Sequence, residues 1–191
     1  MINSVCIFGA SSMTLSESYL GPARALGRLM GEQGIQLVFG GGQHGIMGAV
    51  AEGVHERGGS VLGIIPDKLD KAHISYAASD EWIVTEDLRD RKAIMQERSD
   101  AYIVLPGGFG TLDELMESLS MKQLDFHRKP IILLNTNGFF DALHAFFDHM
   151  IAENCLRNEH LGLMQWGDTP GQVIALLQSY VPITPTDKYS S

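Results

Sequence analysis

Residues 102–111 read YIVLPGGFGT, a short apolar run that ends at a proline and continues through three glycines into a threonine. The apolar run is continuous rather than alternating, which is typical of a strand buried on both faces. Similar runs, each followed by Gly, Pro or Asn, lie at 5–8, 35–39, 61–65 and 131–134. Segments with helical spacing lie at 16–33, 45–57, 87–98, 111–124, 138–153 and 170–180. This alternation predicts an α/β fold: a Rossmann-like, doubly wound parallel β-sheet flanked by helices on both faces.

The chain is expected to form a single domain. Its 191 residues match the size of one ordinary globular domain, and 45% of them are hydrophobic. Residues 1–183 are predicted to make up this domain, with 184–191 as a flexible C-terminal tail. Residues 82–84 predict a further short strand. Ligands of such sheets bind beyond the carboxyl ends of the strands, so the loops after the apolar runs are the candidate sites.

The composition argues against several classes of partner and site. Fourteen Lys and Arg residues against 23 Asp and Glu give a net charge of −9, which is unfavourable for binding nucleic acid or an anionic membrane. Two cysteines, Cys6 and Cys155, predict neither a disulfide framework nor a zinc cluster, and they favour a reducing compartment, the cytoplasm. No apolar run approaches 18 residues, no signal peptide is expected, and the seven histidines form no metal pattern.

The loop at 40–45 reads GGGQHG and satisfies the pattern G-x-G-x-x-G, with Asp67 placed 22 residues further on. These are ingredients of a dinucleotide site, which makes an NAD-dependent oxidoreductase one hypothesis. Gly41 and Gly42 could equally approach a single phosphate. A third interpretation is structural, because consecutive glycines also allow a tight turn and close packing of a helix on a strand.

The loop at 106–111 is the stronger candidate for an anion site. Because three of its residues are glycine, few side chains cover its backbone amides. A helix is expected to begin at Thr111, and the dipole of that helix would favour a phosphate there. No lysine follows the glycines, and the P-loop pattern therefore fails. The predicted phosphate-binding residues of this loop are Pro106, Gly107, Gly108, Gly110 and Thr111.

Glu114 has two interpretations. Thr111 and Glu114 have the spacing of a capping box, in which the glutamate is purely structural. Alternatively, a carboxylate one turn into a helix that binds phosphate could face a ribose, where it would stabilise an oxocarbenium ion or activate water. Glu117 lies one turn further along the same face and could share that role.

Two further segments could reach the same strand ends. Residues 88–95 are the most cationic part of the chain, and they are either a solvated helix face or the source of a phosphate-binding arginine. Ser11 and Ser12 follow the first predicted strand, where they either donate hydroxyl hydrogen bonds to a ligand or cap a helix.

Taken together, these motifs resemble the "Lonely guy" (LOG) family, the cytokinin-activating phosphoribohydrolases. Residues 106–114 fit the motif PGGxGTxxE of that family. Arg91-Lys92, then Met95, then SDA at 99–101 keep its order and spacing upstream. FGGG at 39–42, GIMG at 45–48 and CIFGASS at 6–12 extend the resemblance, which covers roughly residues 2–180.

The resemblance implies hydrolysis of the N-glycosidic bond of an N6-modified adenosine 5′-monophosphate, with release of the free base and ribose 5-phosphate. It places catalytic roles on Arg91 and Glu114, a phosphate seat on the glycine loop, and Lys92 and Met95 at the substrate. It further implies no cofactor, and a homodimer whose pocket lies near the subunit interface. Some members are labelled lysine decarboxylases, yet no lysine here is marked as a pyridoxal ligand. Met121 replaces a tryptophan of many plant members, which leaves the base preference open.

The main alternative is a non-catalytic carrier of a nucleotide or cofactor, because one fold serves many functions.

Overall fold

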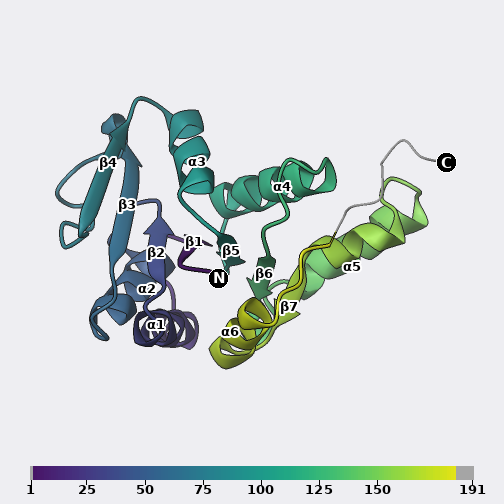
Figure 1. Cartoon of the computed structure of the whole chain (residues 1–191), viewed down its shortest axis with the longest axis horizontal. Helices are drawn as coiled ribbons and strands as arrows, with labels where there is room; N and C mark the ends of the chain where they lie inside the picture. Colours follow the sequence, from purple (N-terminus) through teal and green to yellow (C-terminus); the bar gives the residue numbers. More distant parts are fainter. Residues whose placement is uncertain (1, 184–191) are drawn as a thin grey trace.

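The computed structural model describes residues 2–183, and within them the chain forms one sheet of seven parallel strands (Figure 1). The strands follow the spatial order β4-β3-β2-β1-β5-β6-β7. The predicted α/β class and doubly wound sheet are confirmed, and the expected tail at 184–191 lies outside the described residues. The strands are β1 Ser4–Phe8, β2 Gln36–Phe39, β3 Val61–Pro66, β4 Glu81–Thr85, β5 Ala101–Val104, β6 Ile131–Leu134 and β7 Gln165–Gly167.

Helices cover both faces of the sheet, and Figure 1 shows α1 and α6 on one side with α3 and α4 on the other. The helices are α1 Glu17–Glu32, α2 Gly45–His55, α3 Leu88–Glu97, α4 Phe109–Gln123, α5 Asp141–Ala152 and α6 Pro170–Gln178. Alternate residues of β1 point to opposite cores: Val5 and Ile7 pack with α1, α2 and α6, whereas Cys6 and Phe8 pack with α3, α4 and α5. Burial of both faces explains why the strands read as continuous apolar runs.

The strand order reverses between β1 and β5, and this reversal positions the site. The two strands pair in register from Val5 with Ala101 to Phe8 with Val104. The chain leaves β1 toward one face and β5 toward the other, so the loops that follow them separate and leave a crevice. The Ala10 amide donates to the Pro106 carbonyl at 3.0 Å and holds the two loops together at its base.

One strand and two helix starts differ from the expected elements by more than one residue or were not expected. The strand at 82–84 is confirmed as β4, whereas β7 was not predicted, because three residues reading QWG carry no apolar pattern. Helix α5 begins at Asp141 rather than at 138, because Asn137 and Gly138 have φ of 56° and 68° and interrupt the helix. Helix α4 begins at Phe109, two residues before Thr111.

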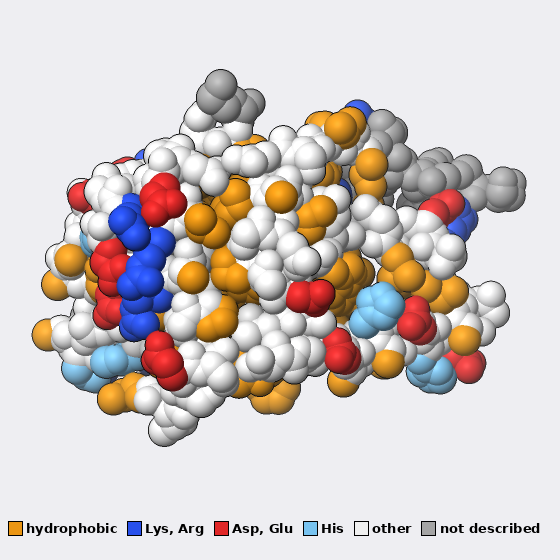
Figure 2. Space-filling view, turned by 90° about the horizontal axis from the view of Figure 1, so that it is seen from below, with side chains coloured by type: hydrophobic (Ala, Val, Ile, Leu, Met, Phe, Trp, Pro, Cys, Tyr) orange, Lys and Arg blue, Asp and Glu red, His pale blue; other side chains and the backbone are white. Residues whose placement is uncertain are grey.

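Charged side chains on α1, on α2 and on the C-cap residue of α2 neutralise one another. Arg24 pairs with Glu17 and Glu52, and Arg28 pairs with Glu56. Figure 2 shows basic side chains flanked by acidic ones on one face of the molecule.

Within the described residues, no helix is both long enough and apolar enough to cross a membrane.

Helices α1 and α2 approach each other through glycines. A Cβ atom on Gly27 would lie 2.2 Å from the Val50 carbonyl oxygen, and one on Gly53 would lie 2.2 Å from the Arg24 carbonyl oxygen. Backbone atoms cannot move aside as the end of a flexible side chain can, so any side chain at these positions would push the helices apart.

We expect Gly53→Ala to lower the free energy of unfolding by about 1–3 kcal/mol, the usual cost of overpacking. Helix propensity alone would give the opposite sign, by about 0.5–1 kcal/mol. Gly171→Ala is the matched control, because Gly171 lies in α6 with no atom within 4 Å of an added Cβ. Urea unfolding of both variants measures the difference, and equal stabilisation by both would contradict the packing argument.

Candidate active site

A cavity of about 450 Å³ lies at the crevice between the β1 and β5 loops. Its walls come from the turn after β1, the start of α2, one face of α3 and the first turns of α4. The lining residues are Gly9, Ala10, Ser11, Ser12, Met47, Leu88, Arg91, Lys92, Gly108, Gly110, Thr111, Asp113 and Glu114.

The start of α4 lines the cavity and presents backbone amides suited to an anion. Gly108 is the N-cap residue of α4, and no atom lies within 4 Å of a Cβ added to Gly108 or Gly110. The amides of a first helical turn have no partner inside the helix, so they are available to an anion, and the helix dipole favours negative charge there. Gly107 has a steric role instead, because a Cβ on it would lie 2.0 Å from the Thr111 hydroxyl oxygen.

The turn after β1 forms the opposite wall. The Ile46 amide donates to the Ala10 carbonyl at 2.8 Å, which fixes the turn against the start of α2. Ser12 Oγ accepts from the Thr14 amide at 3.3 Å. Helix α1 has Ser16 as its N-cap residue, so Ser11 and Ser12 line the cavity and do not cap that helix.

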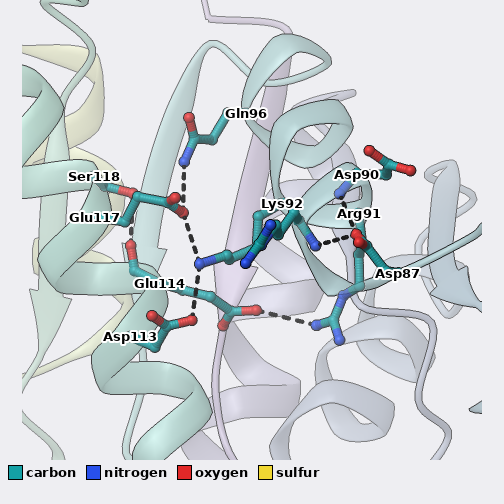
Figure 3. Close-up of polar contacts among 10 residues, drawn as sticks. Asp87, Asp90, Arg91, Lys92, Gln96, Asp113, Glu114, Glu117 and Ser118 are labelled. Atoms are coloured by element: carbon teal, nitrogen blue, oxygen red, sulfur yellow. Dashed lines mark hydrogen bonds and ion pairs between the residues drawn. The ribbon is translucent and has the colours of Figure 1, made fainter.

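Arg91 of α3 and Glu114 of α4 meet at the lining of the cavity (Figure 3). Arg91 Nη2 donates to Glu114 Oε1 at 3.1 Å, and the two side chains are only 13% and 12% exposed. A Cβ on Gly40 would lie 2.2 Å from Arg91 Nη2, so the guanidinium group rests against bare backbone. Among the described residues, the buried Arg91 Nε has no hydrogen-bond partner.

Burial raises the pKa of Glu114 to about 7, and the positive charge of Arg91 opposes that rise. The carboxyl group therefore changes its charge close to neutral pH, as expected of a group that exchanges protons or stabilises charge during a reaction. The capping-box interpretation of Glu114 is wrong: Thr111 is the third residue of α4, and the glutamate side chain binds Arg91.

Lys92 binds the two other carboxylates of this part of α4. Its Nζ lies 3.0 Å from Asp113 Oδ2 and 3.2 Å from Glu117 Oε2 (Figure 3). Gln96 Nε2 donates to the same Glu117 oxygen at 3.2 Å. These contacts tie α3 to α4 beside the Arg91–Glu114 pair.

Of the residues that the sequence assigned to the site, eight line the cavity: Ser11, Ser12, Arg91, Lys92, Gly108, Gly110, Thr111 and Glu114. Six others lie outside its lining: Gly41, Gly42, Met95, Pro106, Gly107 and Glu117. Met95 is 1% exposed and packs in the core between α3 and the sheet.

The glycine loop at 40–45 serves packing in this structure. A Cβ on Gly41 would lie 2.9 Å from the Trp82 ring, and the Gly41 carbonyl accepts from the Tyr76 amide at 2.8 Å. The Gln43 amide donates to the Ile74 carbonyl. Because this backbone is bound by the segment before β4, it does not favour the dinucleotide interpretation.

Met47, Leu88 and Asp113 line the cavity although the sequence had not assigned them to it. Leu88 lies three residues before Arg91 and Asp113 one residue before Glu114, so helical spacing was the available signal for Leu88. Met47 follows the glycine loop in the first turn of α2.

Comparison with known proteins identifies relatives over most of the chain. A family model described as "Possible lysine decarboxylase" matches residues 47–177. The chain is 38% identical to cytokinin riboside 5′-monophosphate phosphoribohydrolase LOG2 of Arabidopsis thaliana over 178 residues, which is 93% of this chain and 84% of that protein. It is 36% identical to the LOG phosphoribohydrolase of Oryza sativa, covering 93% and 74% of the two chains.

Solved structures share the fold with a different described role. The molybdenum cofactor binding protein of Rippkaea orientalis matches with a TM-score of 0.73 and 26% identity, covering 94% of this chain and 97% of that one. The molybdenum cofactor carrier protein of Chlamydomonas reinhardtii matches with a TM-score of 0.71 and 26% identity, covering 93% and 97%.

The raised pKa of Glu114 predicts a pH-dependent effect of Glu114→Gln on stability. The pKa of Glu114 is 4.5 in the unfolded chain and about 7 in the folded protein, so between these pH values the native state binds more protons than the unfolded state. The stability that the protonated carboxyl group contributes is therefore fully present below pH 4.5 and is lost as the pH rises through 7. Glutamine does not titrate. We therefore expect the variant to gain stability relative to the parent from pH 5 to pH 8, by at most about 3 kcal/mol.

Urea unfolding at both pH values measures this gain. Glu32→Gln on the surface of α1 is the control, because its carboxylate is half exposed and, within residues 2–183, paired only with Arg57. If the free energies of Glu114→Gln and the parent changed in parallel with pH, the carboxyl group would not have the proposed environment.

Proposed function

Since the chain belongs to the LOG family of cytokinin riboside 5′-monophosphate phosphoribohydrolases, we propose that it hydrolyses the N-glycosidic bond of N6-modified adenosine 5′-monophosphates. The products are the free base and ribose 5-phosphate. The observation that carries the proposal is the buried Arg91–Glu114 pair, which lies in one cavity with the glycine-capped start of α4.

The spacing along α4 suits a nucleoside monophosphate. Gly110 and Glu114 are four residues apart, which corresponds to about 6 Å along the helix axis. A phosphate bound at the helix start would therefore leave its ribose beside the carboxyl group. Ser11 and Ser12 on the facing wall supply hydroxyl donors to the phosphate, and Met47 and Leu88 give the cavity an apolar side suited to a purine.

The charges fit cleavage of a glycosidic bond. As the C1′–N bond breaks, its electron pair leaves with the purine, and C1′ becomes an oxocarbenium ion. The Glu114 carboxylate stabilises that positive charge and orients a water molecule, whose hydroxyl adds to C1′ while its proton is passed on to the departing base. Arg91 holds the carboxylate in place and favours its ionised form. None of these steps calls for a metal or a redox cofactor.

A carrier of a phosphorylated cofactor is the second candidate, supported by the two molybdenum cofactor proteins of the same fold. Such a carrier would use the anion site without cleaving a bond. The Arg91–Glu114 pair favours the hydrolase, because cleavage needs a charged group beside the bond that breaks, whereas binding alone does not.

We also propose a homodimer with the pocket near the subunit interface. Large apolar side chains on and around α4 and α5 are exposed, which supports an interface on this side of the molecule. They are Phe109, Leu124, Phe126, Phe139 and Phe146, and Phe109, which follows the N-cap of α4, is 93% exposed.

A cytoplasmic location completes the proposal. Cys6 and Cys155 are both free thiols, and Cys155 is exposed, which fits a reducing compartment. The substrate would be a small nucleotide, and the net charge of −9 gives no support to nucleic acid or an anionic membrane as partner.

We expect Glu114→Gln to lower the release of free base by about 10²–10³-fold, the usual cost of losing one electrostatic contact to a transition state. The amide keeps the shape of the side chain and an acceptor for Arg91, but it carries no charge. Chromatographic assay of base and ribose 5-phosphate from N6-isopentenyladenosine monophosphate and from AMP measures the effect. Glu32→Gln, remote from the cavity, serves as control. Turnover in Glu114→Gln close to the parent's would refute the catalytic role.

Light scattering of the purified protein should give twice the chain mass of 20.9 kDa. We expect Phe126→Asp to weaken this association, because its ring is 73% exposed and a charge there would have to be desolvated in an interface. A monomer at micromolar concentration would rule out the dimer.

A further inference from the structure

Lys92 is unusual for a cavity residue, because its ammonium group is already paired with two carboxylates of the protein. It follows Arg91 on α3, its side chain is 19% exposed, and its Nζ contacts both Asp113 and Glu117. Asp113 and Glu117 lie on either side of Glu114 along α4, so three carboxylates face α3 within five residues. Figure 3 shows Lys92 between the two outer carboxylates, and Arg91 on the inner one.

The ionisable groups around Glu114 come from three elements. Arg91 and Lys92 face it from α3, Asp113 and Glu117 lie beside it on α4, and the Cys6 thiol of β1, which burial and the charge of Glu114 keep neutral by raising its pKa, is the ionisable neighbour from the third element. Asp113 and Glu117 each disfavour ionisation of Glu114, while Arg91 and Lys92 favour it. Without Lys92, the single cation Arg91 would face three neighbouring carboxylates.

Resting on the proposed hydrolysis, we propose that Lys92 is a positioning residue rather than a phosphate ligand: it neutralises Asp113 and Glu117, ties α3 to α4, and so keeps Glu114 ionised opposite Arg91. Gln96 supports the arrangement from the next turn of α3 through its bond to Glu117. Catalysis would then depend on Lys92 only through Glu114.

The pH dependence of kcat/KM distinguishes the two roles, because its acid limb reports a titrating group of the free enzyme. We expect Lys92→Met to move the acid limb to higher pH by about half a unit to one unit and to leave most of the activity above that limb. We expect the triple variant Lys92→Met/Asp113→Asn/Glu117→Gln to return the limb to its original position. Lys71→Met, an exposed lysine after β3, is the control for the loss of a positive charge.

A phosphate ligand would behave differently. Its loss would raise KM at every pH, and neutralising Asp113 and Glu117 would not restore activity. That outcome would overturn the proposal, as would an acid limb that stays in place in Lys92→Met.

The double variant Asp113→Asn/Glu117→Gln tests the same idea with Lys92 intact, in case Lys92→Met does not fold. We expect its acid limb to move to lower pH, and an unchanged limb would contradict the charge argument. NMR titration of the Glu114 carboxyl group in each variant measures the same shifts without turnover. If the parent releases no base, the proposed function fails, while the shifts measured by NMR still decide the role of Lys92.

Discussion

A carboxyl group with little access to water has to be stabilised by its neighbours, and the arrangement around Glu114 follows from that constraint. Burial alone would keep the group neutral. Its partner Arg91 comes from another helix, so α3 and α4 must stand side by side over the reversal of strand order between β1 and β5. Gly40 matters for the same reason, because only a residue without a side chain leaves space for the guanidinium group.

Backbone groups and side chains have different roles in the cavity. The glycines at the start of α4 expose amides for an anion, and they carry no chemistry of their own. The charged side chains of α3 and α4 act at the other end of the cavity, one helical turn away. The backbone part does not titrate, whereas the Glu114 carboxyl group changes its charge near neutrality.

Local patterns predicted the fold well, because buried parallel strands are continuous apolar runs that stop at glycine or proline. They failed where structure depends on neighbours. Strand β7 exists because its edge pairs with β6, although QWG has no strand signal. The glycines at 40–45 and at 107–110 look alike in sequence, yet the segment before β4 covers the first loop while the second opens into the cavity. The Arg91–Glu114 contact joins residues 23 apart, and only the resemblance to a family paired them.

The fold alone does not separate an enzyme from a carrier, because the chain is similar in sequence to phosphoribohydrolases and similar in structure to a molybdenum cofactor binding protein. Holding a phosphorylated ligand requires amides and hydroxyls, which the β1 and β5 loops supply. Breaking its glycosidic bond requires in addition a negative charge beside C1′, and burial makes that charge costly. Arg91 offsets the cost directly. The outer carboxylates Asp113 and Glu117 would add to it, and Lys92 lies where it cancels them. A storage site has no need of such compensation, so these paired charges are the part of the molecule that argues for catalysis.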